Sequence, residues 1–188
     1  MRKNLGKNTV ITPLPVFVIA TYDEKGAPNA MTAAWGTQCG YHEVTFLLGP
    51  HKTTENLKAK KAFTLSFATT DTVTVSDYFG VESGESVDKI KKAGVHVVKS
   101  DFVDAPVIAE YPLTLECEVV EMRPIEEDFQ IVGRVVNVNA DEKILDAQGK
   151  IDLGKLRPIA YDSASHLYRL VGDAVGKAFQ DGLKIKNG

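Results

Sequence analysis

Short apolar runs rich in β-branched residues recur along the chain, and polar turns separate them. Residues 16–21 are typical of a buried strand, and residues 22–26 of a turn whose glycine can adopt positive φ. Residues 27–35 return as the second arm of a hairpin. Residues 44–48 and 63–67 have the same character, so the first half of the chain predicts four short strands.

Two short helices are predicted in the same half. Residues 53–61 have a Thr start, an acidic first turn and a basic last turn, which suits the helix dipole. In residues 86–93, Ser86 can cap the start, Asp88 lies in the first turn, and Gly94 closes the end. Residues 72–79 are ambiguous, because their Thr and Val residues favour a strand whereas Asp71 could cap a helix.

The second half is rich in strands. Residues 113–122 alternate apolar and polar side chains with period two, which predicts a strand buried on one face. Residues 129–139 are similarly rich in β-branched residues, 146–150 form a turn, and 166–171 are predicted as the last barrel strand. Many short strands with only short helices between them indicate an antiparallel β-barrel or sandwich.

Length and composition fit one ordinary globular domain. The chain has 188 residues, 44% of them hydrophobic and 25% charged, and it contains no repeat or linker. Residues 1–188 are therefore expected to form a single domain. A formal net charge of −3 argues against a general nucleic-acid binder, and two distant cysteines, Cys39 and Cys117, do not make a disulfide framework.

Several familiar motifs are missing from the sequence. The apolar run 16–20 is too short for a signal peptide or a membrane span, so a cytoplasmic protein without membrane association is expected. The chain has no GxGxxG, P-loop or HExxH motif. Its four histidines have no ligand spacing, so no metal site is expected; they are His42, His51, His96 and His166.

Residues 28–35 are the first of three candidate ligand-binding segments. Ala30, Ala33 and Ala34 stand beside Met31, Thr32 and Trp35. Small side chains would let a flat ligand approach the backbone closely. The alternative is a barrel strand whose small residues pack under a helix.

The second segment, 48–56, joins a strand end, a Gly-Pro loop and a helix start. Thr53 and Thr54 follow Lys52 at that start, and a helix N-terminus with hydroxyls and a cation suits an anion. The alternative is an ordinary capped helix. The third segment, 88–94, carries three lysines that could neutralise a phosphate or simply form a solvated face.

The ordered series of these motifs resembles the flavin reductase-like family, which has the FMN-binding split-barrel fold, and within it the flavoredoxins most of all. The resemblance spans nearly the whole chain through residues 12–16, 29–35, 52–56, 61–66, 88–94, 104–108, 115–117, 156–159 and 168–170. It implies a mainly β fold, namely a six-stranded antiparallel Greek-key split barrel with short flanking helices. It also implies a homodimer with one FMN per subunit near the interface.

The resemblance also assigns residues to the cofactor. The residues that would line the isoalloxazine ring are Asn29, Ala30, Met31, Thr32, Ala33, Ala34 and Trp35. The residues that would contact the ribityl phosphate are Lys52, Thr53 and Thr54. Asn56 would brace that turn, and Lys89 or Lys92 would add positive charge. Residues 36–42 depart from the Ser- and Pro-containing loop that is more usual in the family.

The function implied is that of an FMN-dependent oxidoreductase that passes electrons from NAD(P)H, or from a small redox protein, through bound FMN. The redox chemistry belongs to the flavin, so no conspicuous acid–base residues are needed and no catalytic residue is assigned. The alternatives are a non-catalytic FMN-binding electron carrier or flavin store, and a split-barrel dimer that acts only as an interaction module.

Overall fold

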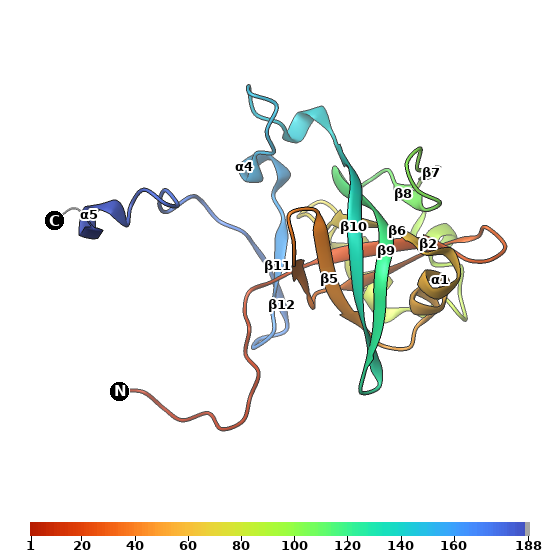
Figure 1. The fold of residues 1–188 in the computed structure, drawn as a ribbon, viewed down its shortest axis with the longest axis horizontal. Helices are drawn as coiled ribbons and strands as arrows, with labels where there is room; N and C mark the ends of the chain where they lie inside the picture. The colour runs from red at the N-terminus through yellow and green to blue at the C-terminus, as the bar shows by residue number, and fades with distance from the viewer. Residues whose placement is uncertain (187–188) are drawn as a thin grey trace.

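In the computed structural model, which describes residues 1–186, a curled antiparallel sheet of seven strands runs in the order β3-β2-β6-β9-β10-β5-β4 (Figure 1). Its strands are β2 (Phe17–Tyr22), β3 (Pro28–Ala33), β4 (Gly36–Gln38), β5 (Glu43–Leu48), β6 (Ala62–Phe67), β9 (Leu113–Ile125) and β10 (Asp128–Ala140). The split barrel expected from the sequence is confirmed, but with seven strands rather than six, because the short β4 pairs with β5.

Two smaller sheets and a few short helices surround this sheet. The smaller sheets consist of β1 (Leu14–Pro15), β11 (Ile159–Asp162) and β12 (Leu167–Leu170), and of β7 (Val97–Lys99) and β8 (Pro106–Ile108). The helices are α1 (Lys52–Lys60), α2 (Val73–Val81), α3 (Lys89–Ala93), η1 (Glu142–Ile144), α4 (Leu153–Leu156) and α5 (Leu183–Lys186). None of the helices within residues 1–186 is long and apolar enough to span a membrane.

The core lies on both faces of β2, because alternate side chains of a strand point to opposite sides. Val18 and Ala20 pack with Phe79 of α2 on the outer face. Phe17 and Ile19 face the barrel interior. The ring of Phe63 packs there edge-on against Phe46, with 5.3 Å between centroids. Since β2 is buried on both faces, it appears in the sequence as an unbroken apolar run.

Two sequence expectations need correction, and one open choice is resolved. Residues 166–171 do not form a barrel strand, because β12 pairs with β11 in the separate three-stranded sheet. The second helix begins at Lys89, and Asp88 caps it rather than Ser86, by accepting a hydrogen bond from the Lys91 N–H. The ambiguous segment 72–79 becomes helix α2.

Strand β9 departs from its expected one-sided burial. Thr114 and Glu116, on the face expected to be polar and exposed, are both buried. Thr114 shares a 2.8 Å hydrogen bond with Ser66, and Glu116 accepts one from Asn137. Pairing between polar side chains therefore offsets the cost of burying them on this face.

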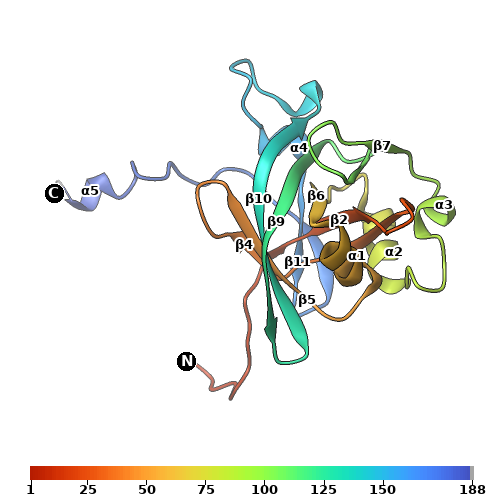
Figure 2. The ribbon, with the colours of Figure 1, turned by 45° about the vertical axis from the view of Figure 1, so that its right-hand side comes forward.

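Strands β3 and β4 follow one another in the chain but stand at opposite edges of the seven-stranded sheet. The split of the barrel lies between these edges, and residues 34–35 connect them. Figures 1 and 2 show the N-terminal segment and the segment after β12 leaving the barrel on the same side. The free edges and the two extended segments are the features that position the candidate site.

Candidate functional site

A cavity of about 220 Å³ lies beside β3, and we call it the edge cavity. It is bounded by the start of α1, the end of α2 with the residues after it, and the start of α3. Its lining consists of Asn29, Met31, His51, Lys52, Thr53, Phe79, Gly80, Val81, Glu82, Ser83, Gly84 and Lys89. A second hollow of about 270 Å³ shares Asn29, Lys52, Gly84 and Lys89 with it, so the two form one continuous region.

The N-terminus of α1 opens on this cavity without a side-chain cap. His51 occupies the N-cap position in an extended conformation, and no side chain there bonds the first N–H groups. The Thr54 hydroxyl instead donates to the Gly49 carbonyl at 2.6 Å. Free N–H groups and the positive end of the helix dipole together favour an anion at this place.

Asn29 fixes one wall of the cavity. Its Nδ2 donates to Thr53 Oγ1 at 2.8 Å, which leaves the Thr53 hydroxyl proton free to bond another acceptor. The backbone at Gly84 approaches Asn29 so closely that a Cβ at this position would lie 2.9 Å from Asn29 Cγ. Only glycine at position 84 is compatible with this placement of Asn29.

Two lysines bring positive charge to the cavity. Lys52 lies 3.6 Å from Asp23 and is partly exposed. Lys89 is only 4% exposed, and its Nζ donates to the Phe79 carbonyl at 3.0 Å. Burial lowers the pKa of Lys89 to about 8, and the nearby Glu82 carboxylate opposes that shift. A bound anion would stabilise the charged form of this amine.

Lys92 lies on the same short helix as Lys89 but in different surroundings. Its Nζ pairs with Glu82 at 3.4 Å, and its side chain remains largely exposed. It is not part of the lining of the edge cavity. Of the two lysines between which the sequence left the choice open, the structure therefore brings Lys89 to the cavity.

Thr54 and Asn56 lie behind the cavity wall. Asn56 Nδ2 donates to Thr21 Oγ1 at 3.0 Å, and both residues are buried. This bond ties α1 to β2, while Thr54 ties the same helix to the preceding loop. Their polar groups hold the helix start in place and do not line the edge cavity.

The segment 29–35 is divided between several environments. Asn29 and Met31 line the edge cavity, whereas Ala30 and Ala33 are buried in the two core clusters on opposite faces of the sheet. Thr32 donates to the Ser76 carbonyl of α2. The half-buried Ala34 and the 61% exposed Trp35 follow the strand. The small residues Ala30 and Ala33 therefore pack in the core, although they belong to the strand whose edge is free.

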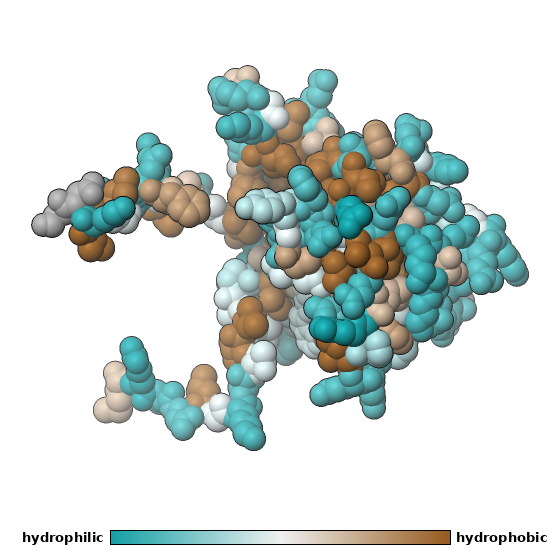
Figure 3. Space-filling model, in the orientation of Figure 1, coloured by the Kyte–Doolittle hydropathy of each residue, from teal (hydrophilic) through white to brown (hydrophobic). Residues whose placement is uncertain are grey.

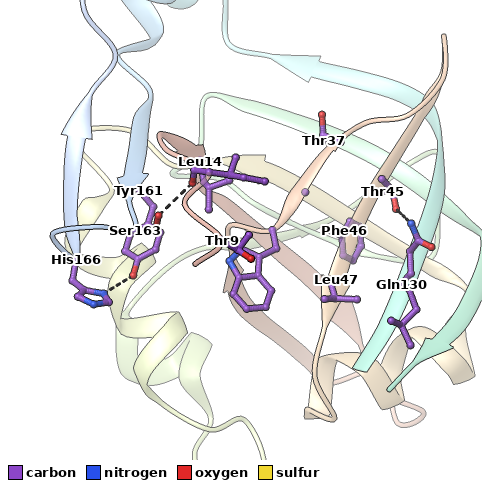
Figure 4. A pocket seen from close by; sticks show the side chains of 14 residues that line it. Thr9, Leu14, Thr37, Thr45, Phe46, Leu47, Gln130, Tyr161, Ser163 and His166 are labelled. Carbon is purple, nitrogen blue, oxygen red and sulfur yellow. Dashed lines mark hydrogen bonds between the residues drawn. The ribbon is translucent and has the colours of Figure 1, made fainter. Parts of the chain in front are cut away.

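Trp35 lines a second, larger cavity of about 840 Å³, which we call the Trp35 cavity (Figure 4). Apolar side chains of the N-terminal segment, β1 and β5 form much of it, including Ile11, Leu14 and Phe46. At one end the Tyr161 hydroxyl and His166 Nδ1 share a 2.7 Å hydrogen bond. Sequence reasoning missed Tyr161 and the residues after α2, because no local motif marks them.

The sequence also matches a known protein family. A family described as flavin reductase-like domain matches residues 10–162. This chain belongs to the flavin reductase-like family. Membership in it indicates a flavin site, and the free edge of β3 beside an uncapped helix start suits a long ligand with an anionic end.

Known structures and sequences agree with this family. The chain is 34% identical to the flavoredoxin of Desulfovibrio vulgaris (Miyazaki F), over 97% of this chain and 100% of that one, with a TM-score of 0.91. The flavoredoxin from Methanosarcina acetivorans is 29% identical over 98% and 100% of the two chains, with a TM-score of 0.90. The flavoredoxin resemblance within the flavin reductase-like family is thereby confirmed.

More distant relatives add less. The FMN-binding protein from Thermus thermophilus is 21% identical over 94% of this chain and 99% of that one, with a TM-score of 0.79, and shows the shared fold alone. An uncharacterized protein of Aquifex aeolicus is 25% identical over 121 residues, which are 64% of this chain and 62% of that protein.

Proposed function

We propose that this member of the flavin reductase-like family is an FMN-dependent oxidoreductase that takes electrons from NAD(P)H or a small redox protein. The observation that carries the proposal is the edge cavity, where the uncapped start of α1 meets Thr53, Lys52 and Lys89. Two cations, a free hydroxyl and helix N–H groups are the donor set that a phosphate monoester needs.

The rest of the ligand would follow the free edge of β3. From Asn29 to Trp35 the chain advances roughly 20 Å, at about 3.3 Å per residue. Strand β3 pairs only with β2, so its second row of backbone N–H and C=O groups is unpaired by any strand within residues 1–186. These groups can bond the polar edge of a flavin ring while the phosphate remains at α1.

When bound, FMN supplies the electron-transfer chemistry. The chain itself binds and orients the group. The Asn29–Thr53 bond sets the position of the hydroxyl, and the bond from Asn56 to Thr21 holds α1 against the barrel. Lys52 and Lys89 would balance the phosphate charge.

We further propose that the protein works as a homodimer whose interface includes the face around β4. The Trp35 cavity and a neighbouring hollow of about 480 Å³ are both lined by Gly36, Thr37 and Thr45, so they adjoin at β4. Tyr41, which follows β4, is 98% exposed. A second subunit would cover this apolar surface and complete the shelter of the flavin.

Anaerobic spectroscopy of the purified protein tests this function. Bound FMN should give a flavin absorption band near ~450 nm, and NADH, NADPH or a reduced small redox protein should bleach it at a rate that supports turnover. If FMN is bound but none of these donors reduces it at a rate that supports turnover, the electron carrier or flavin store is favoured instead. Failure to bind FMN at saturating concentration would overturn the proposal.

A further inference from the structure

Residues 171–186, which we call the C-terminal arm, have no place to pack in their own chain. We propose that the C-terminal arm of one subunit covers the Trp35 cavity of the other. This inference rests on the proposed FMN-binding homodimer. It names the element that covers the cavity and assigns that element to the opposite subunit.

The arm is not held by its own barrel. Every residue from 171 to 186 is exposed. Beyond Val171, the hydrogen bonds and the ion pair that the described arm residues make stay within residues 176–186. Figures 1 and 3 show the arm projecting from the barrel instead of folding back over it. Beyond Val171, no hydrogen bond or ion pair to the rest of the described chain therefore fixes its course.

Apolar residues recur in the arm at every fourth position, as Val171, Val175, Phe179 and Leu183. Val175 and Phe179 are essentially fully exposed, at 103% and 99%. Glycines, alanines and four polar residues stand between them, so the large apolar side chains are separated by small or polar ones. A regular series of large exposed apolar side chains indicates a surface that is buried in an assembly.

The Trp35 cavity offers a matching surface on the same side of the molecule. It is mainly apolar, and Trp35 and Ile11 beside it are 61% and 65% exposed. Figure 3 shows the two terminal segments reaching outward with a face of the barrel between them. Because each arm leads away from its own barrel, the cavity that an arm can reach in a symmetric dimer is the partner's.

The two flavoredoxin structures have residues that align with much of the arm. Their alignments take in 97% and 98% of this chain and all of the other chain, with TM-scores of 0.91 and 0.90. Most of the arm falls within such coverage. Much of the arm is therefore a segment that this chain shares with the two flavoredoxins.

Trp35 reports directly on this contact, because it is the one tryptophan of the chain. The test variant is Val175→Ser with Phe179→Ser in the full-length protein. Its matched control is Lys177→Ser with Gln180→Ser, which changes polar residues of the same arm. Acrylamide quenching of Trp35 emission is compared at equal flavin occupancy. We expect quenching to rise at least twofold in the test variant and to remain unchanged in the control.

Mixed dimers decide which subunit supplies the arm. One chain carries Trp35→Phe, so the fluorescence comes only from the other chain. Trp35 should be protected from acrylamide when the chain that carries it has the altered arm and the partner chain has the intact arm. It should be accessible to acrylamide in the reverse combination. The opposite pattern, or equal quenching in all dimers, would overturn the proposal.

Separate measurements distinguish failure of the arm from failure of the proposed function. Light scattering reports the dimer, and flavin absorption reports the cofactor. If both are intact and the serine substitutions leave Trp35 quenching unchanged, the arm proposal alone fails. A full-length protein that remains monomeric with FMN bound would overturn the arm and the dimer together, but not flavin binding.

Discussion

Raising the pH should weaken FMN binding through a single buried amine, that of Lys89. The amine is 4% exposed and bonds the Phe79 carbonyl, and its pKa lies at about 8 instead of the ordinary 10.5. The second ionisation of a phosphate monoester lies near pH 6, so the ligand keeps its charge above pH 7. Loss of affinity above pH 8 would therefore report the protein and not the phosphate.

The size of the effect follows from the lost charge. A hydrogen bond to a charged group contributes roughly 1.5–3 kcal/mol. Because a single amine with a pKa of about 8 is only about 1.5 pH units past its midpoint at pH 9.5, the expected loss of affinity between pH 7 and pH 9.5 is ~10- to 30-fold. Stability should change in the opposite direction. Between pH 8 and 10.5 the unfolded chain keeps a proton that the folded chain has lost, so the free energy of unfolding of the apoprotein rises, by up to about 3 kcal/mol.

Equilibrium titration with FMN from pH 7 to 9.5 measures the first effect, and urea unfolding of the apoprotein measures the second. Lys89→Met should remove most of the pH dependence from both. Lys92→Met is the control, because this lysine lies on the same helix but is exposed and paired with Glu82. Affinity that stays flat across this range in the wild type, or equal losses in the two variants, would refute the role of Lys89.

Two glycines give further predictions. Gly84→Ala should weaken FMN binding about tenfold or more in a flavin titration, and should also lower the free energy of unfolding, because its Cβ displaces the buried Asn29 side chain that bonds Thr53. Gly133→Ala should lower the free energy of unfolding by about 1–3 kcal/mol, because its Cβ would overlap Cζ of the buried Phe63 ring and lie 2.7 Å from Cε1 of the same ring. If urea unfolding gives this variant the same free energy of unfolding as the wild type, that packing is contradicted.

Local patterns predicted most of the barrel. Apolar runs and turn residues located β2, β5 and β6, and charge placement located α1, because these signals lie within a few residues of each other. Position in the sheet was harder to predict. Strand β12 has the composition of a barrel strand, yet it pairs with β11, since the choice of partner depends on distant residues. The burial of Glu116 depends in the same way on Asn137, across the β9–β10 pair.

The candidate site likewise contains residues that a local motif marks and residues whose role depends on distant parts of the chain. The sequence marks the start of α1, because Lys52, Thr53 and Thr54 are adjacent there. It does not distinguish Lys89 from Lys92, because helix α3 has to be placed against α2 before one amine is buried and the other exposed. Nor does it mark Gly84, whose role comes from a close approach to a strand 55 residues earlier.

The split in the barrel connects these observations. An unpaired sheet edge is usually a liability, because it invites pairing with other chains. Here β3 and β4 leave two such edges although only residues 34–35 separate them. Helix α2 and the proposed ligand would cover the first edge, and the partner subunit the second. Trp35 stands between the two edges, so a flavin on one side and a partner's arm on the other would meet at the residue that links them.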